Sequence, residues 1–131
     1  MKLGPAHTLG THSQETLVTT APAPPPPQVH TEAQLEAIFR ARVRLVLGGK
    51  IEKVAPTRRG MPDRLVLLPC NRIWLVELKT TTGKLSPIQE SWHAVARTLV
   101  GRNIAVLRGL PEIETWVHDR AQEYDHLSAL L

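Results

Sequence analysis

Two apolar runs separated by two residues constrain the fold of this chain more than any other feature. The runs are RLVLLP at 64–69 and RIWLVELK at 72–79, and only Cys70 and Asn71 lie between them. Runs of this length on either side of a tight turn predict two antiparallel strands joined as a hairpin. Both runs also carry charged residues at their ends, which a purely structural hairpin does not require.

A proline-rich tail at residues 1–30 precedes the predicted domain at residues 31–131. Six of the 11 prolines lie in the tail, which ends in APAPPPPQ. Such a segment favours extended polyproline II and cannot build a core. It is expected to act as a flexible spacer or, less commonly, as a ligand for a proline-recognising domain.

Capping and periodicity signals predict an α/β domain of order α-β-β-β-α-β-α, a mixed sheet flanked by helices. TEAQ and SPIQ both have the form of a capping box, with Thr31 and Ser86 as the N-caps. The expected elements are a helix from Thr31 to Gly48-Gly49, strands at 51–55, 64–69 and 72–79, a helix from Ser86 to Gly101, a strand at 103–107 and a helix from about Pro111.

Composition limits the classes of function. Residues 31–109 carry 14 lysines and arginines against 6 acidic residues, whereas residues 110–131 carry 5 acids and one arginine. A basic body favours a polyanionic partner such as nucleic acid, although basic composition alone is weak support. No run approaches the roughly 20 apolar residues of a membrane span. The single cysteine, Cys70, excludes an internal disulfide and fits a reducing, cytoplasmic setting.

The charged end of the second run marks a candidate site. Side chains alternate along a strand, so Glu77 and Lys79 share one face and lie about 7 Å apart. That face is otherwise apolar, and a carboxylate there is unfavourable unless it is paired or binds a cation. A simple ion pair between Glu77 and Lys79 would satisfy it, and this is the commoner explanation for an isolated Glu-x-Lys.

Asp63 favours a cation instead, provided that the hairpin brings it beside Glu77. Two close carboxylates repel one another, and a hard divalent ion such as Mg²⁺ reconciles them. A two-residue loop would oppose Arg64 to Glu77 and turn Asp63 to the other face. A three-residue loop would oppose Leu65 to Glu77 and Asp63 to Lys79. The first run is apolar throughout, so periodicity does not choose, and we predict the three-residue loop.

A third acid, Glu32, lies in the first turn of the first helix. At about 100° per residue it falls within about 20° of Phe39 and 60° of Leu35, on the side expected to face the core. Glu36 falls further round, toward solvent. Glu32 is therefore expected either to complement the helix dipole or to face the metal.

These motifs together resemble a nuclease family. TEAQLEAIF, then RRGMPDRLVLL, then RIWLVELKTTTGKLSPIQ are similar to the VRR-NUC (virus-type replication-repair nuclease) family of the PD-(D/E)xK superfamily, over about residues 31–118. Gly-x-Pro-Asp, Glu-Leu-Lys and Gly-x-Leu-Ser-Pro-x-Gln in this order are far more specific than Glu-x-Lys alone. The resemblance implies a restriction-endonuclease-like core.

The resemblance also implies a role for each matching residue. Asp63 and Glu77 match the metal-binding carboxylates, and the backbone carbonyl of Leu78 is expected to complete the ligands that the protein provides. Lys79 matches the lysine that orients the attacking water or steadies the phosphate.

Further matches lie outside the two strands. Gln89 matches a glutamine that reaches the site from the second helix, and Glu32 matches the glutamate of the first helix. Gly60 and Pro62 are expected to shape the turn that delivers Asp63. The hairpin turn departs from the family, because it reads Pro-Cys-Asn where relatives tend to have glycine.

Four cations are expected to flank the cleft and contact phosphates, with simple solvated charge as the alternative: Arg58, Arg59, Arg64 and Lys84. His93, on the second helix, is expected to be a surface or packing residue rather than a base.

The function expected from the resemblance is a Mg²⁺-dependent DNA endonuclease, with Mn²⁺ as a substitute. It would select branched, flap or four-way junction DNA in replication, repair or phage DNA processing. A homodimer would cut two strands symmetrically, a replication or repair partner such as a helicase is conceivable, and the setting would be a bacterial or phage-infected cell. The alternative is a non-catalytic nucleic-acid-binding module of the same fold.

Overall fold

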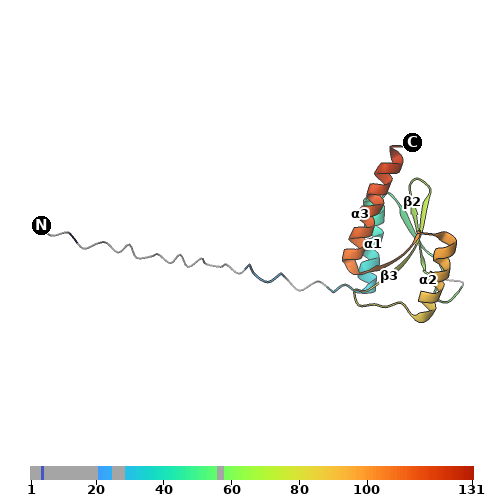
Figure 1. The fold of residues 1–131 in the computed structure, drawn as a ribbon, viewed down its shortest axis with the longest axis horizontal. Coiled ribbons are helices and arrows are strands. Elements are labelled where there is room, and N and C mark those ends of the chain that lie inside the picture. The colour runs from blue at the N-terminus through green and yellow to red at the C-terminus, as the bar shows by residue number, and fades with distance from the viewer. Residues whose placement is uncertain (1–3, 5–20, 25–28, 56–57) are drawn as a thin grey trace.

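A four-stranded sheet separates two layers of helices (Figure 1). The computed structural model describes residue 4 and residues 21–24, 29–55 and 58–131. Most of the predicted tail at 1–30 lies outside the described residues. Helices α1 (Glu32–Leu45) and α3 (Gly109–Ser128) lie side by side on one face of the sheet, and α2 (Pro87–Val100) lies on the other.

The predicted order α-β-β-β-α-β-α is confirmed. The sheet has the spatial order β1-β2-β3-β4, with the first three strands antiparallel and β4 parallel to β3. Its strands are β1 (Lys50–Lys53), β2 (Arg64–Leu68), β3 (Arg72–Lys79) and β4 (Ile104–Arg108). Helix α3 begins at Gly109, two residues before the predicted start. No helix among the described residues is long and apolar enough to cross a membrane.

Both predicted capping boxes form. In α1 the Thr31 amide donates to Gln34 Oε1 at 2.9 Å, and the Gln34 amide donates to Thr31 Oγ1 at 3.2 Å. In α2 the Ser86 amide donates to Gln89 Oε1 at 2.9 Å, and the Gln89 amide donates to Ser86 Oγ at 3.2 Å. Each capping box provides acceptors for two backbone N–H groups at the start of the helix, which would otherwise bind water.

The main core lies between the sheet and the α1/α3 layer. Trp74, Val76 and Leu78 point into it from β3, as the alternation predicts. Trp116 of α3 contacts Trp74 and Phe39 edge-on, with ring centroids 5.5 and 5.4 Å apart. Such pairs contribute about 0.5–1.5 kcal/mol beyond their burial.

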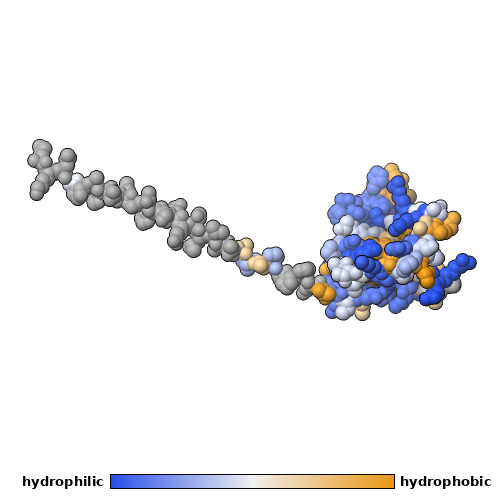
Figure 2. All heavy atoms as spheres, turned by 60° about the horizontal axis from the view of Figure 1, so that its bottom comes forward, coloured by the Kyte–Doolittle hydropathy of each residue, from blue (hydrophilic) through white to orange (hydrophobic). Residues whose placement is uncertain are grey.

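The opposite face is covered less completely. Helix α2 carries an apolar stripe, but Ile88, Val95 and Leu99 of this stripe are 44%, 59% and 78% exposed, and only Ala96 of it is buried. Ile73, which points to this side from β3, is 52% exposed. Figure 2 shows hydrophobic side chains reaching the surface of the folded part among polar ones. This helix therefore leaves much of its apolar side unburied in the single chain.

The hairpin has a three-residue loop, but its register differs from the predicted one by two residues. Leu68 pairs with Arg72 and Leu65 with Leu75, rather than Leu65 with Glu77. Continued by one step, this register places Asp63 opposite Glu77 instead of Lys79. The predicted face of Asp63 is therefore right and its predicted partner is wrong, because the loop occupies residues 69–71 rather than 70–72.

The loop contains two residues in the left-handed region, Cys70 at φ 63° and Asn71 at φ 58°. Asparagine tolerates this conformation, whereas cysteine has no local hydrogen bond that compensates for the clash of its Cβ. The absence of glycine in this turn is thus a local cost in backbone energy.

Cys70→Gly should therefore stabilise the protein by about 0.5–1 kcal/mol, since relief of the strain outweighs the added chain entropy. Urea unfolding would show the gain as a higher midpoint at unchanged slope. Cys70→Ala keeps the Cβ and serves as the control, with no gain expected. Equal midpoints for the glycine and alanine variants would contradict the strain.

Candidate active site

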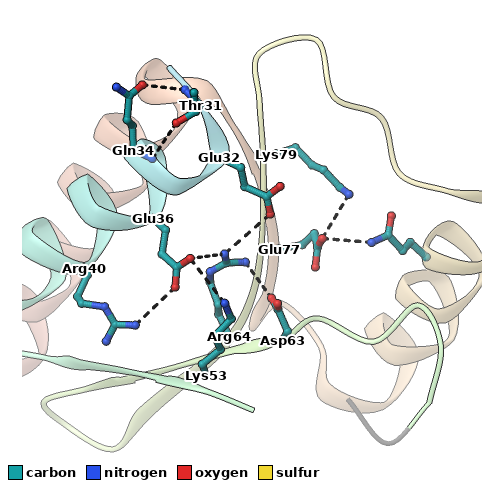
Figure 3. A network of polar contacts seen from close by, with 11 residues as sticks. Thr31, Glu32, Gln34, Glu36, Arg40, Lys53, Asp63, Arg64, Glu77 and Lys79 are labelled. Atoms are coloured by element: carbon teal, nitrogen blue, oxygen red, sulfur yellow. Dashed lines mark hydrogen bonds and ion pairs between the residues drawn. The ribbon is translucent and has the colours of Figure 1, made fainter. Parts of the chain in front are cut away.

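Glu77 is the centre of a polar cluster on the α2 side of the sheet (Figure 3). It lies near the end of β3 and is 7% exposed. Gln89 Nε2 donates to Glu77 Oε1 at 3.1 Å, and Lys79 Nζ lies 3.4 Å from the same oxygen. The three predicted residues therefore meet, and both contacts engage one carboxylate oxygen.

Asp63 reaches this cluster from the turn before β2. The Val54 amide donates to the Asp63 carbonyl at 2.8 Å, which extends the pairing of β1 with β2 to this residue. Pro62 is fully buried, and Gly60 has φ 89°. A Cβ on Gly60 would come within 2.6 Å of the Ile88 carbonyl oxygen, so glycine lets this turn lie against the first turn of α2. The expected role of Gly60 and Pro62 in shaping the turn agrees with this packing.

The two carboxylates raise an electrostatic problem. Burial raises the pKa of Glu77; the Lys79 charge opposes this effect, and the nearby Asp63 charge adds to it. The outcome is a raised pKa, so Lys79 does not fully compensate for burial and repulsion. A pair of acids with this imbalance is suited to an additional cation.

Arg64 is placed differently from the prediction. Its side chain is 3% exposed and points to the α1 side of the sheet. Nη1 donates to Asp63 Oδ1 at 2.8 Å, and Nη2 donates to Glu36 Oε2 at 3.0 Å. The expected contact of Arg64 with phosphates is wrong, because the guanidinium is buried in ion pairs and not on the flank of a cleft.

Helix α1 contributes two acids, but not in the predicted way. Glu36, expected to face solvent, pairs with Arg64 at 3.0 Å, and its side chain is only 22% exposed. Burial acts to raise the pKa of Glu36, but the hydrogen bond and charge of Arg64, together with the charges of Lys53 and Arg40, outweigh it and the pKa is lowered. Glu32 is 61% exposed, with Oε1 3.9 Å from Arg64 Nη2, at the outer end of the cluster (Figure 3). The angular positions of residues around the helix did not predict the role of Glu36, because they do not take into account that an arginine on a strand can reach it.

The donor set fits a hard divalent cation of the magnesium type. In the part of the chain that the structure describes, no three acidic, histidine or cysteine side chains form a group able to hold a metal ion. Asp63 and Glu77 offer two carboxylates, a number that suits Mg²⁺, which characteristically takes one or two carboxylates and keeps several waters.

The remaining predicted residues are cations at the surface. Arg58, Arg59 and Lys84 are exposed, as a phosphate-binding role requires. The two arginines border a groove of about 820 Å³ whose other lining residues are mostly apolar and include Trp92 and Val95 of α2.

His93 is a packing residue, one of the two roles expected. It is 1% exposed and lies edge-on to Trp92 at 5.9 Å. Burial, together with the charges of Arg97 and Lys79, lowers the pKa of His93, which favours the neutral ring.

Comparison with known proteins identifies the family. No protein-family model matches the chain. Over 76 residues the chain is 40% identical to "Putative nuclease p44" of Acyrthosiphon pisum secondary endosymbiont phage 1, an alignment that spans 58% of this chain and 81% of that protein. Among solved structures, the chain matches a VRR_NUC domain with a TM-score of 0.60 and 29% identity, covering 66% of this chain and 94% of that one.

The sequence match to a nuclease relative and the structural match to a VRR_NUC domain agree with one another. Together they show that this chain belongs to the VRR-NUC nuclease family.

Proposed function

We propose that this nuclease is a metal-dependent DNA endonuclease that hydrolyses phosphodiester bonds in branched, flap or four-way junction DNA. One observation carries the proposal: Glu77 Oε1 is contacted by both Lys79 and Gln89, and the nearby Asp63 charge acts on the same carboxylate. Acid, lysine and amide thus converge on one point, and the pairing of carboxylates is costly without a cation.

Hydrolysis forms a bond between a water oxygen and phosphorus, and breaks one phosphorus–oxygen bond whose oxygen leaves with a proton. Asp63, Glu77 and the backbone carbonyl of Leu78 would hold Mg²⁺ or Mn²⁺, which neutralises the phosphate and lowers the pKa of the bound water. Glu32, at the outer end of the cluster, would face the metal from α1 without being one of its two carboxylate ligands.

Lys79 and Gln89 have separate parts in this mechanism. The Lys79 ammonium lies 3.4 Å from Glu77 Oε1, so it brings positive charge to the place where negative charge grows on the phosphate. Gln89 fixes the rotamer of Glu77 through the 3.1 Å contact from Nε2, which keeps the carboxylate in place before a ligand arrives.

DNA would approach across the exposed cations Arg58, Arg59 and Lys84. Arginine and lysine contacts to phosphate supply affinity and orientation without reading base sequence. This fits selection by DNA structure rather than by sequence. A replication or repair partner such as a helicase, which the family resemblance leaves open, is not singled out by any of the described residues.

A homodimer would allow two strands to be cut symmetrically. The apolar side of α2 supports this proposal, since Ile88, Val95 and Leu99 are 44–78% exposed beside a mostly apolar groove. Contiguous exposed apolar surface on a small chain commonly marks a protein interface. A second copy of the chain is the partner that we propose for this surface.

The alternative function is a DNA-binding module without cleavage. It would need the exposed arginines but not the buried Glu77, whose pKa is raised by burial. Retention of a charge that is unfavourable in the folded state therefore favours catalysis.

Cleavage of a panel of linear, flap and four-way DNAs should require Mg²⁺ or Mn²⁺ and stop on addition of EDTA. Asp63→Ala and Lys79→Ala should each reduce the rate by about 100-fold or more, because each removes charge stabilisation that acts in the transition state. Gel assays with end-labelled DNA would measure the rates.

Lys50→Ala is a matched control for loss of one lysine, since Lys50 pairs with Glu52 on β1 rather than with the site. It should cleave at the wild-type rate, and binding of the two inactive variants to DNA should persist. An inactive wild type on every substrate with either metal would favour the binding module. Full activity of Asp63→Ala or Lys79→Ala would mean that the site is misassigned.

Glu77→Gln should stabilise the metal-free protein at neutral pH. The pKa of Glu77 is raised above the usual 4.5 in the folded protein, so the folded state binds this proton more tightly than the unfolded state. That stabilisation is complete below pH 4.5 and is lost as the pH rises through the raised pKa, and the neutral amide avoids the loss.

Thermal unfolding in EDTA across pH 4–8 would measure this difference. Glu52→Gln, at an exposed carboxylate, serves as the control and should not stabilise the protein. Added Mn²⁺ should raise the melting temperature of the wild type but not of Glu77→Gln. A variant less stable than the wild type at neutral pH would contradict the expected cost of Glu77.

Val95→Glu combined with Leu99→Glu should convert the dimer to a monomer, because two buried charges at an apolar interface are unfavourable. Gel filtration with light scattering would measure the mass. Ala94→Glu, at an exposed position of the same helix, is the matched control and should remain dimeric. A monomeric wild type, or a double variant that stays dimeric, would exclude this interface.

A further inference from the structure

Arg64 lies in a position that the mechanism above does not use. Its guanidinium is buried between α1 and the turn that carries Asp63 (Figure 3). Nη1 donates to Asp63 Oδ1 at 2.8 Å and Nη2 donates to Glu36 Oε2 at 3.0 Å, so separate nitrogens hold the two acids. The arginine thus links a rigid helix to one of the two carboxylates of the site.

A cation in this place needs an explanation. A positive charge in contact with Asp63 competes with any metal ion bound by the same carboxylate. On electrostatic grounds alone, Arg64 should weaken the proposed metal site. Its charge is offset by Glu36, and the 3.9 Å separation from Glu32 adds to this compensation.

The position of Arg64 offers a benefit that can offset this electrostatic cost, because the arginine orients Asp63. A charge-assisted hydrogen bond to Oδ1 fixes the rotamer of Asp63 and leaves Oδ2 for another ligand. Glu36 in turn restricts the guanidinium, because it belongs to a helix that packs on the core through Leu35 and Phe39. Two further cations contact Glu36: Arg40 lies 3.6 Å from Oε1, and Lys53 lies 3.8 Å from Oε2, the oxygen that Arg64 also contacts.

We propose that Arg64 and Glu36 are positioning residues that orient Asp63 for metal binding. This inference rests on the proposed function, because it assigns to a buried ion pair the task of preorganising the metal site. Outer residues that orient a ligand typically change metal affinity by about 10–100-fold when they are replaced.

The proposal and simple electrostatics predict opposite signs. Arg64→Gln removes a positive charge beside Asp63, so charge alone predicts tighter binding of a cation. Positioning predicts weaker binding, by about 10–100-fold, since Asp63 is no longer held. Arg64→Gln combined with Glu36→Gln leaves the net charge unchanged and avoids an unpaired buried carboxylate, and it should bind metal as weakly.

The test is titration of the full chain with Mn²⁺ without DNA, with the free ion measured by electron paramagnetic resonance. Circular dichroism and thermal unfolding in EDTA would report folding of each variant. Arg42→Gln is the matched control, because it also removes one arginine of an ion pair, that with Glu114 at 3.0 Å between α1 and α3. It should bind Mn²⁺ as the wild type does.

Weakened Mn²⁺ binding in the folded double variant, with normal binding by Arg42→Gln, would support positioning. Equal or tighter binding in a folded Arg64 variant would overturn it. So would failure of both Arg64 variants to fold, which would assign the ion pair to stability. Asp63→Asn separates the two levels. If Asp63→Asn abolishes binding while the Arg64 variants bind normally, only this inference fails. If the wild type binds no Mn²⁺, the proposed metal site fails with it.

Discussion

The pairing register of β2 with β3 is the constraint on which the site depends. Side chains alternate across a sheet, so a shift by one residue would turn Asp63 away from Glu77 and bring Arg64 in its place. The register in turn depends on a three-residue loop that contains two left-handed residues. Backbone strain at the hairpin tip and the meeting of two acids at the opposite end of the same two strands are thus parts of one arrangement.

The helices on the two faces of the sheet bury their apolar side chains to different extents, and this difference bears on function. The α1/α3 side holds a continuous core with the aromatic cluster around Trp116. The α2 side holds the polar cluster and leaves apolar side chains of the helix exposed. One side of the sheet therefore supplies stability, and the other supplies the charged site together with the surface for which we propose a partner.

Local signals were sufficient to predict most of the fold. Capping boxes at Thr31 and Ser86 and the apolar runs fixed the type and order of the elements, because these depend on neighbours in sequence. The register was predicted on the correct face but two residues out, since an apolar run can slide without changing its pattern. The exposure of Val95 and Leu99 could not be predicted, because helical periodicity identifies an apolar side without showing what covers it.

Among the site residues, too, some contacts could be predicted from the sequence and others could not. Glu77, Lys79 and Gln89 meet as expected, because they lie on a strand and at a helix start whose geometry is regular. The burial of Arg64 and its bond to Glu36 were not predicted. Alternation along β2 puts Arg64 on the α1 side of the sheet, but its pairing with Glu36 depends on how closely α1 packs there. Pairings of this kind depend on tertiary distances that no spacing in the sequence encodes.

Gln89 has two duties, and together they restrict which amino acid can stand there. Its oxygen closes the first turn of α2 and its nitrogen holds Glu77. For the helix alone, glutamate would serve at this position as well as glutamine. A glutamate would nevertheless set a further negative charge against an acid that is already hard to ionise. Replacing Gln89 by glutamate is therefore conservative for the helix but disruptive for the site. Unfolding of the first turn of α2 would also release the contact to Glu77.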